Sequence, residues 1–258
     1  MIFRSIIVNR LIGPAKTTIL LSVVFFFAAF AVEVTAQKRF SRTFPAGQNV
    51  RLNLMNRTGT VVVEGWSRSE INIVASLEAP AANIEPRSDG GIIDINLVRD
   101  NMGRGEVGNV NFTVRVPYNA AVDIETRIGN LSVSNIRSRG HVRAHISSDG
   151  DITLTNIVAP RIAAENRMGD IFFEGEVMQD GIYRFESMSG RINLVIPFSS
   201  SFRFVATAPS TRNINLGPFA SAESGSVGDG RRLVGRFNSG SATLTATTKR
   251  GSIAFFAR

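Results

Sequence analysis

The sequence contains no cysteine among its 258 residues, and it has one tryptophan and two histidines. The lack of cysteine excludes a disulfide-stabilised scaffold, a thiolate metal site, a cysteine nucleophile and a cysteine-linked lipid anchor. Residues 127 to 195 also lack an apolar stripe with a period of 3.6 residues, which argues against helices there. The chain has instead 23 glycines and 18 phenylalanines, in a length that can bury a sizeable core.

The two histidines, His141 and His145, are four residues apart. On a helix they could share a metal ion. On a strand they lie about 13 Å apart, at roughly 3.3 Å per residue. The surrounding pattern predicts a strand, so we expect two separate, outward-facing polar side chains.

The glycines belong to a repeat. Four segments contain a glycine, then a polar residue, then an apolar-polar-apolar run: 127–133, 148–154, 167–173 and 188–194. Their glycines, Gly129, Gly150, Gly169 and Gly190, are 21, 19 and 21 residues apart. A fixed period near 20 residues is typical of repeat proteins, in which each unit buries its apolar face by stacking on the next.

Each repeat contains two runs of alternating apolar and polar residues, so the unit is two strands rather than a strand and a helix. The sequence therefore predicts an all-β, single-domain parallel β-solenoid with irregular terminal caps. We expect a right-handed coil, because parallel crossovers nearly always are. The predicted inward ladder of the first strands is Leu131, Val133, Ile152, Leu154, Ile171, Phe173, Ile192 and Leu194.

The period weakens outside the four regular units. Before them we expect strands at 40–46, 50–54, 60–63, 71–75, 92–97 and 110–116, with loops at 78–91 and 99–109. After Pro197 we expect a strand at 202–206 and a mobile loop at 217–232, which is rich in serine and glycine. A last copy of the glycine pattern spans residues 243–255, and we expect it at the frayed end of the stack.

The N-terminal segment has the pattern of a secretory signal. Arg4, Arg10 and Lys16 precede an apolar run over 19–32, and small residues follow before Gln37. The run has 14 residues, whereas a membrane-spanning helix needs about 20. We expect a cleaved signal peptide, and an uncleaved anchor is the alternative.

The predicted organisation is then a signal peptide or anchor at 1–36 and a β-solenoid domain at 37–258. Removing the first segment would lower the formal charge from +8 to +6. A basic, exported domain without cysteine is typical of a bacterial periplasm or cell surface.

Three stretches resemble the family of bacterial putative adhesins, which are exported envelope proteins. They are Asn-Arg-Thr-Gly-Thr-Val-Val-Val-Glu-Gly-Trp (56–66), the run from Val116 to Leu131, and Thr-Lys-Arg-Gly-Ser-Ile (248–253). The resemblance covers about residues 40 to 258. It implies a β-solenoid and an exported location, and it carries over no catalytic residues.

Polar residues recur directly after the repeated glycines. Asn130, Asp151 and Asp170 hold this position in three successive units, and Arg191 holds it in the fourth. Stacked strands would place neighbours about 4.8 Å apart, so the column could bind Ca²⁺ through oxygen ligands. The alternative is that asparagine and aspartate serve the turn geometry. We favour that alternative, since Arg191 ends the column.

Three arginines are predicted to lie on the outer face of the second strands, Arg143, Arg184 and Arg203, and Arg161 lies nearby. Together they could form a basic stripe for phosphates or acidic glycans. The alternative, which we favour, is an ordinary solvated face, because Glu165 and Glu186 are interspersed.

Residues 103–108 match the dinucleotide pattern G-x-G-x-x-G. That motif needs a following helix whose N-terminus faces the pyrophosphate. The predicted element after it is a strand, so we interpret the segment as a loop.

The sequence therefore favours a non-enzymatic, exported envelope protein that offers a rigid surface for binding or adhesion. We expect no cofactor and no nucleic-acid partner. An anionic envelope glycan or lipid, or an envelope protein, is the expected class of partner. The alternatives are a glycan-active β-helix enzyme, and an envelope-stress or signalling accessory that binds another protein.

Overall fold

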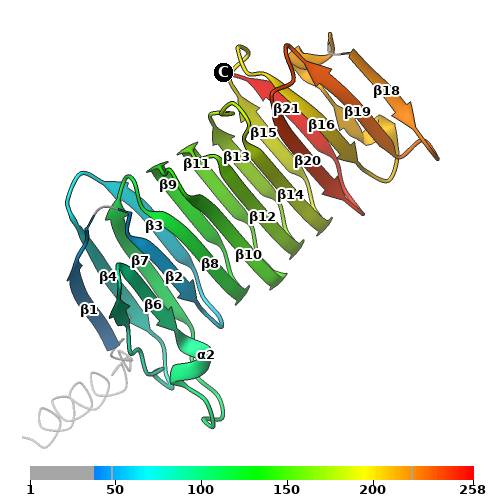
Figure 1. Ribbon diagram of the computed structural model, residues 1–258. Helices are drawn as coiled ribbons and strands as arrows, with labels where there is room; N and C mark the ends of the chain where they lie inside the picture. The colour runs from blue at the N-terminus through cyan, green and yellow to red at the C-terminus, as the bar shows by residue number, and fades with distance from the viewer. Residues whose placement is uncertain (1–37, 48, 222) are drawn as a thin grey trace, which may run out of the picture. The chain divides into compact units, whose positions relative to one another are not determined.

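The computed structural model describes residues 38–47, 49–221 and 223–258 (Figure 1). The predicted signal segment at 1–36 lies outside these residues. The described strands belong to one compact unit and form a ten-stranded sheet and an eleven-stranded sheet, here called sheet A and sheet B. The prediction of an all-β protein is confirmed.

The strands of sheet A lie side by side in the following order. They are β1 (Lys38–Pro45), β4 (Glu70–Leu77), β7 (Val110–Pro117), β3 (Val61–Trp66), β9 (Leu131–Arg137), β11 (Ile152–Val158), β13 (Ile171–Gly175), β15 (Ile192–Ile196), β21 (Ile253–Ala257) and β17 (Ile214–Asn215).

The order in sheet B is similar. It runs β18 (Glu223–Val227), β19 (Arg232–Phe237), β16 (Phe202–Thr207), β20 (Ala242–Thr248), β14 (Ile182–Ser189), β12 (Arg161–Met168), β10 (His141–Asp149), β8 (Ala121–Ile128), β2 (Arg51–Met55), β6 (Ile92–Asn96) and β5 (Arg87–Asp89).

The middle of the chain forms regular coils, each with one strand in each sheet. Strands β9, β11, β13 and β15 pair in parallel in sheet A, and β8, β10, β12 and β14 do so in sheet B. Equivalent positions are in register, so that Ile152 pairs with Leu131 on one side and Ile171 on the other. This is the stacked arrangement that the repeat predicts.

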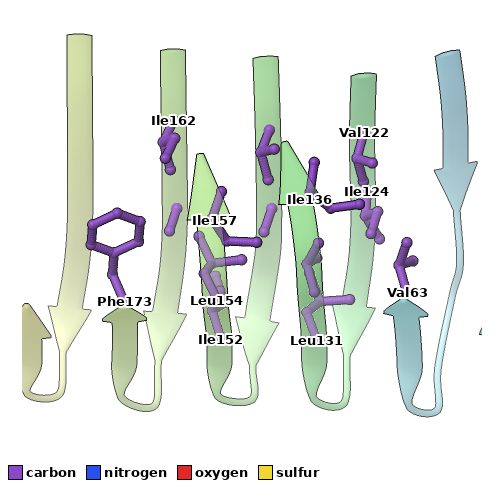
Figure 2. Close-up of a cluster of buried hydrophobic side chains, with 14 of the residues drawn as sticks. Val63, Val122, Ile124, Leu131, Ile136, Ile152, Leu154, Ile157, Ile162 and Phe173 are labelled. Carbon is purple, nitrogen blue, oxygen red and sulfur yellow. The ribbon is translucent and has the colours of Figure 1, made fainter. Parts of the chain in front are cut away.

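The core lies between the two sheets (Figure 2). Every residue of the predicted inward ladder is at most 1% exposed. In sheet B, Ala144 and Ala164 stand in register beside the larger Phe185, whose ring centre is 5.0 Å from that of Phe173. The small side chains leave room for the aromatic ones within one continuous core.

The order of the stack differs from the order of the chain at both ends. The last strands, β20 and β21, return to lie directly against β14 and β15, while β16 and β17 lie beyond them (Figure 1). At the other end, β2 lies between β8 and β6, and β3 lies between β9 and β7, so the earlier strands are nearer the middle of their sheets than the later ones. The expectation that the last glycine unit forms the frayed end of the stack was therefore wrong.

Antiparallel strands terminate sheet A at one end and sheet B at both ends, while β17 at the other end of sheet A pairs in parallel with β21. In sheet A, β1 and β4 add to β7, and in sheet B, β19 and β18 add to β16 while β5 adds to β6. These strands replace open parallel edges with short or irregular ones, which limits edge-to-edge association. They are the irregular caps that the sequence predicts.

Three local predictions need correction. Residues 78–91 are not simply a loop, since they contain strand β5, which pairs with β6. Residues 217–232 are not simply a loop, since they contain the short 3₁₀-helix η2 (Gly217–Phe219) and strand β18, which pairs with β19. Leu97 does not extend β6, because it begins a single helical turn, α2 (Leu97–Asp100), capped by the side chain of Asn96. The other 3₁₀-helix is η1 (Thr211–Asn213).

None of the described helices is long and apolar enough to cross a membrane.

Candidate functional site

The glycine corner is the turn by which each coil passes from sheet B to sheet A. It contains Gly59, Gly129, Gly150, Gly169, Gly190 and Gly251. Their φ angles lie between +111° and +157°, a region that favours glycine. A β-carbon at Gly150 would collide with the carbonyl oxygen of Gly129, and the same collision recurs from coil to coil along the column. Glycine is required here by backbone conformation and by the close approach of the next coil.

A buried polar column supports the same turn from inside. Asn166, Ser187 and Thr248 donate hydrogen bonds to the carbonyl oxygens of Gly150, Gly169 and Gly190, at 3.0, 3.3 and 3.0 Å. These polar residues are at most 7% exposed. Each bond satisfies a carbonyl of a neighbouring coil, so the coils are held in register at this edge.

The polar column after the glycines forms a ladder rather than an open set of ligands. A side-chain oxygen of Asn130 accepts the backbone N–H of Asp151, Asp151 accepts that of Asp170, and Asp170 accepts that of Arg191, at 2.7 to 3.0 Å. The guanidinium of Arg191 also donates to Asp170. Burial acts to raise the pKa of Asp170, but the bonds from Arg191 outweigh it and lower that pKa.

This ladder supports the turn-geometry interpretation of Asn130, Asp151 and Asp170. Within the described residues, no group of three or more histidine, aspartate or glutamate side chains is arranged to hold a metal ion.

The four arginines of the predicted stripe are distributed over sheet B as follows. Arg143 and Arg184 fall in one row across the strands, separated by Ala163, while Arg161 and Arg203 fall in a neighbouring row. The structure therefore does not bring the four together as a single continuous stripe.

Carboxylates lie beside two of these arginines. Arg143 is 2.9 Å from Asp123 and 3.6 Å from Glu125, and Arg184 is 2.9 Å from Glu186 and 3.7 Å from Glu165. This placement supports the interpretation of a solvated, charge-paired face.

The two histidines lie on this face with different partners. His141 Nε2 is 2.9 Å from a guanidinium nitrogen of Arg51, and His145 Nδ1 is 3.5 Å from a carboxylate oxygen of Glu165. Burial lowers the pKa of His141, and the positive charge of Arg51 lowers it further. The neutral ring is therefore the form that accepts the bond from Arg51.

A different set of basic residues, not predicted from the sequence, lies at the glycine corner, and we call them the corner cations. They are Arg57, Arg127, Arg167, Lys249 and Arg250. The first four stand two residues before a corner glycine, and Arg250 stands next to one. None of the five forms an ion pair with a described carboxylate. The signal was present in the sequence, because a basic residue recurs at this position of four of the six glycine units.

Two hollows lie along the glycine corner and share Ser147 on their rims. One, of about 320 Å³, is lined by Arg57 and Arg127 together with Met55 and Val98. The other, of about 290 Å³, is lined by Arg167 and Lys249 together with Met188 and His145. Carboxylates line them too, Glu125 in the first hollow and Glu165 and Glu186 in the second, and these lie beside Arg143 and Arg184. Each hollow therefore combines apolar side chains with two cations that form no ion pair with a described carboxylate.

Exposed apolar side chains lie at the same corner. Ile128, Met168 and Met188 are 40%, 47% and 43% exposed, and we call them the corner crest. Ile128 and Met168 flank Asp149 in one row of the register. Apolar side chains thus share one edge of the coils with cations that have no described carboxylate partner.

The glycine-rich segment 103–108 is a loop, as interpreted from the sequence. Strand β7 follows it, and Gly108 packs against the backbone of Glu78 and Ala79. Its N–H donates to the carbonyl of Pro80. This close contact explains the glycine without a nucleotide.

The solved structures that match the chain share little sequence with it. A putative cell adhesion protein from Clostridium sporogenes is 12% identical, with 86% of this chain and 98% of that chain covered, at a TM-score of 0.48. A putative adhesin from Bacteroides fragilis is 11% identical, with 87% and 99% covered, at 0.32. A putative lipid binding protein from Parabacteroides distasonis is 8% identical, with 86% and 97% covered, at 0.33. No curated protein matches the chain.

Comparison with protein families identifies one family that matches more than half of the chain. Residues 49–200 match the family described as Toastrack DUF4097. This range contains the first two stretches that resemble the putative adhesins, and it contains all four regular glycine units. The chain therefore belongs to the Toastrack DUF4097 family.

Proposed function

We propose that the protein is a non-enzymatic, exported envelope protein that binds an anionic ligand through its glycine corner. The observation that carries the proposal is the set of five corner cations, which have no described carboxylate partner. Elsewhere on sheet B, Arg143 and Arg184 are already neutralised by neighbouring carboxylates. Unpaired cations beside a hollow attract anions more strongly than paired ones.

The rigidity of the corner supports this role. Adjacent coils are about 4.8 Å apart, so the cations occupy fixed steps along the stack. Main-chain bonds and the buried polar column hold each step. A preorganised row of charges loses little conformational entropy on binding, which favours affinity for an extended anion.

The test compares two triple variants with the same loss of charge. The corner variant is Arg127→Gln, Arg167→Gln and Lys249→Gln. The control variant is Arg137→Gln, Arg161→Gln and Arg203→Gln, three exposed arginines away from the corner that form no ion pair with a described residue. Binding is measured by sedimentation against peptidoglycan, lipopolysaccharide and anionic lipid vesicles.

We expect the wild type to bind at least one of these in a salt-dependent manner, and the corner variant to lose that binding. The control variant should retain it. Loss in the control variant alone would assign binding to its three arginines, of which Arg161 and Arg203 belong to the arginine set predicted from the sequence, and would overturn the corner proposal.

An enzyme remains a second candidate because of one pair of carboxylates. Glu165 and Glu186 are direct partners in the register of β12 and β14, and both line the hollow beside His145. Register partners on adjacent strands are about 4.8 Å apart, which is close to the roughly 5–5.5 Å between the two carboxyl groups of retaining glycosidases. Here both carboxylates lie beside the guanidinium of Arg184, which favours a structural role. Turnover of envelope polysaccharide that Glu165→Gln abolishes would favour the enzyme.

A further inference from the structure

We propose that the anionic ligand of the glycine corner is a lipid surface, on which the corner crest inserts between headgroups while the corner cations contact their phosphates. This inference rests on the proposed function and specifies its ligand. It is carried by the presence of both kinds of side chain on one edge: Ile128, Met168 and Met188 are exposed beside Arg127 and Arg167.

The arrangement matches the chemistry of a membrane interface. Interfacial protein segments combine basic side chains, which are attracted to anionic headgroups, with apolar side chains that enter the headgroup boundary. Ile128 and Met168 belong to coils two steps apart, so roughly 10 Å separates them along the stack. Each follows directly after a corner cation in the sequence.

The charge balance of the edge remains positive. Asp149 and Asp151 are the exposed carboxylates of the coil between Ile128 and Met168, where Ser148 takes the place of a cation. Asp170 is already bound by Arg191. The glutamates that line the hollows, Glu125, Glu165 and Glu186, are paired with Arg143 and Arg184. The five corner cations therefore outnumber the two carboxylates of this edge that form no ion pair with a described cation, which favours an anionic over a zwitterionic surface.

The apolar crest distinguishes a lipid surface from a hydrated polyanion. A polysaccharide or free phosphate could neutralise the cations but would leave the crest in water. A bilayer removes part of the crest from water as well, and that burial is favourable. Methionine suits such a surface, because its flexible thioether adapts to irregular packing.

The first experiment uses the chain with vesicles of phosphatidylcholine alone and of phosphatidylcholine mixed with phosphatidylglycerol. The crest variant is Ile128→Ser, Met168→Ser and Met188→Ser, which leaves the charge unchanged. Its matched control is Tyr118→Ser, Ile182→Ser and Val227→Ser, three similarly exposed apolar residues elsewhere. Circular dichroism and the urea midpoint confirm that both variants fold.

We expect binding only to the vesicles that contain phosphatidylglycerol. The affinity of the crest variant for these vesicles should be lower than that of the wild type by about tenfold or more. The corner variant defined above, with three cations replaced by glutamine, should show a similar decrease. The Tyr118, Ile182 and Val227 control should bind like the wild type. Unchanged binding by the crest variant would overturn insertion and reduce the interaction to charge attraction.

The second experiment uses the lack of cysteine in the chain. Met168→Cys and Ile182→Cys each provide one labelling site for an environment-sensitive fluorophore. Vesicles with phosphatidylglycerol should shift the emission of the probe at position 168 to shorter wavelength and leave the probe at position 182 unchanged. Equal responses at both positions would contradict docking through the corner.

Soluble competitors separate this inference from the proposed function. Inorganic phosphate and a soluble acidic polysaccharide should not displace the protein from vesicles at matched ionic strength. Binding to peptidoglycan or lipopolysaccharide without binding to vesicles would overturn the lipid inference and leave the proposed function standing. Absence of binding to every ligand would overturn both.

Discussion

Single positions in this fold differ sharply according to which face of a strand they occupy. Phe173 is fully buried between the sheets, with ring centres 5.0 Å from Phe185 and 6.4 Å from Tyr183. Its neighbour Phe172 stands on the outer face of the same strand and is half-buried. The adjacent pair therefore provides a matched comparison of burial at nearly constant local sequence.

We expect Phe173→Ala to lower the free energy of unfolding by about 3–5 kcal/mol, because it removes a ring and leaves a cavity. Phe172→Ala should cost much less, since its side chain already contacts water. Urea unfolding of the two variants measures the difference. Equal costs would show that the assignment of the inward face is wrong.

His141 should make the stability depend on pH. Its pKa in the fold is lowered from the ordinary 6.5 by burial and by Arg51, although Asp123 acts in the opposite direction. The unfolded chain therefore binds the proton more tightly than the folded chain does. This difference does not affect the free energy of unfolding well above pH 6.5. It lowers that free energy as the pH falls from 6.5 toward the lowered pKa of His141 in the folded chain.

The substitution His141→Gln should reduce that loss, because glutamine can still accept a bond from Arg51 and does not titrate. Urea unfolding at about pH 8 and about pH 5, on either side of the ordinary histidine pKa, measures the effect. The variant should lose less stability than the wild type between the two conditions. Parallel losses would mean that another group causes the acid sensitivity.

At the scale of the element, the glycine corner couples one coil to the next. Gly150 and Gly251 have φ angles of +149° and +152°, and a β-carbon at either would strike the carbonyl oxygen of the glycine in the adjacent coil. Gly228 also has a positive φ, of +78°, but a β-carbon there would meet open space. The comparison separates backbone strain from collision between coils.

We expect Gly228→Ala to cost about 1–2 kcal/mol, the strain of a left-handed residue. Gly150→Ala and Gly251→Ala should each cost more, because the coils must also move apart. The two should be similar, since β21 pairs on both sides within the stack. Thermal or urea unfolding measures all three. A cost at Gly251 as small as at Gly228 would contradict the interleaved order of the last coil.

The sequence predicted the regular coils because their signals are local. Alternation identified the inward ladder, and the glycine period identified the corner. The ion pairs on sheet B were not predictable, since Arg184 and Glu165 meet only after coils stack at a particular register. Strand β18 was missed because serine and glycine rarely favour strands, and its pairing with β19 decides its structure. The corner cations recur in the sequence, but recurrence with the repeat period does not distinguish a binding residue from a residue of the coil itself.

At the scale of the whole described chain, the ends are interleaved. Strand β20 pairs with β14 on one side and β16 on the other, and β21 does the same between β15 and β17. The final 17 residues, 242–258, are therefore an internal layer of the stack rather than its outermost one. Segment 198–241 depends on them for its parallel contacts, although it precedes them in the chain.

This order leads to a test by truncation. A chain that ends at Ser241 lacks β20 and β21, so β16 loses its parallel partner and the aromatic cluster loses Phe255. Segment 198–241 should then unfold, and trypsin should cleave it rapidly after Arg203 and Arg212. The urea midpoint should equal that of a chain that ends at Pro197, because the unfolded segment adds no stability. A higher midpoint together with protection of Arg203 from trypsin would show that β16 can pair directly with β14, and that the stack can form in chain order.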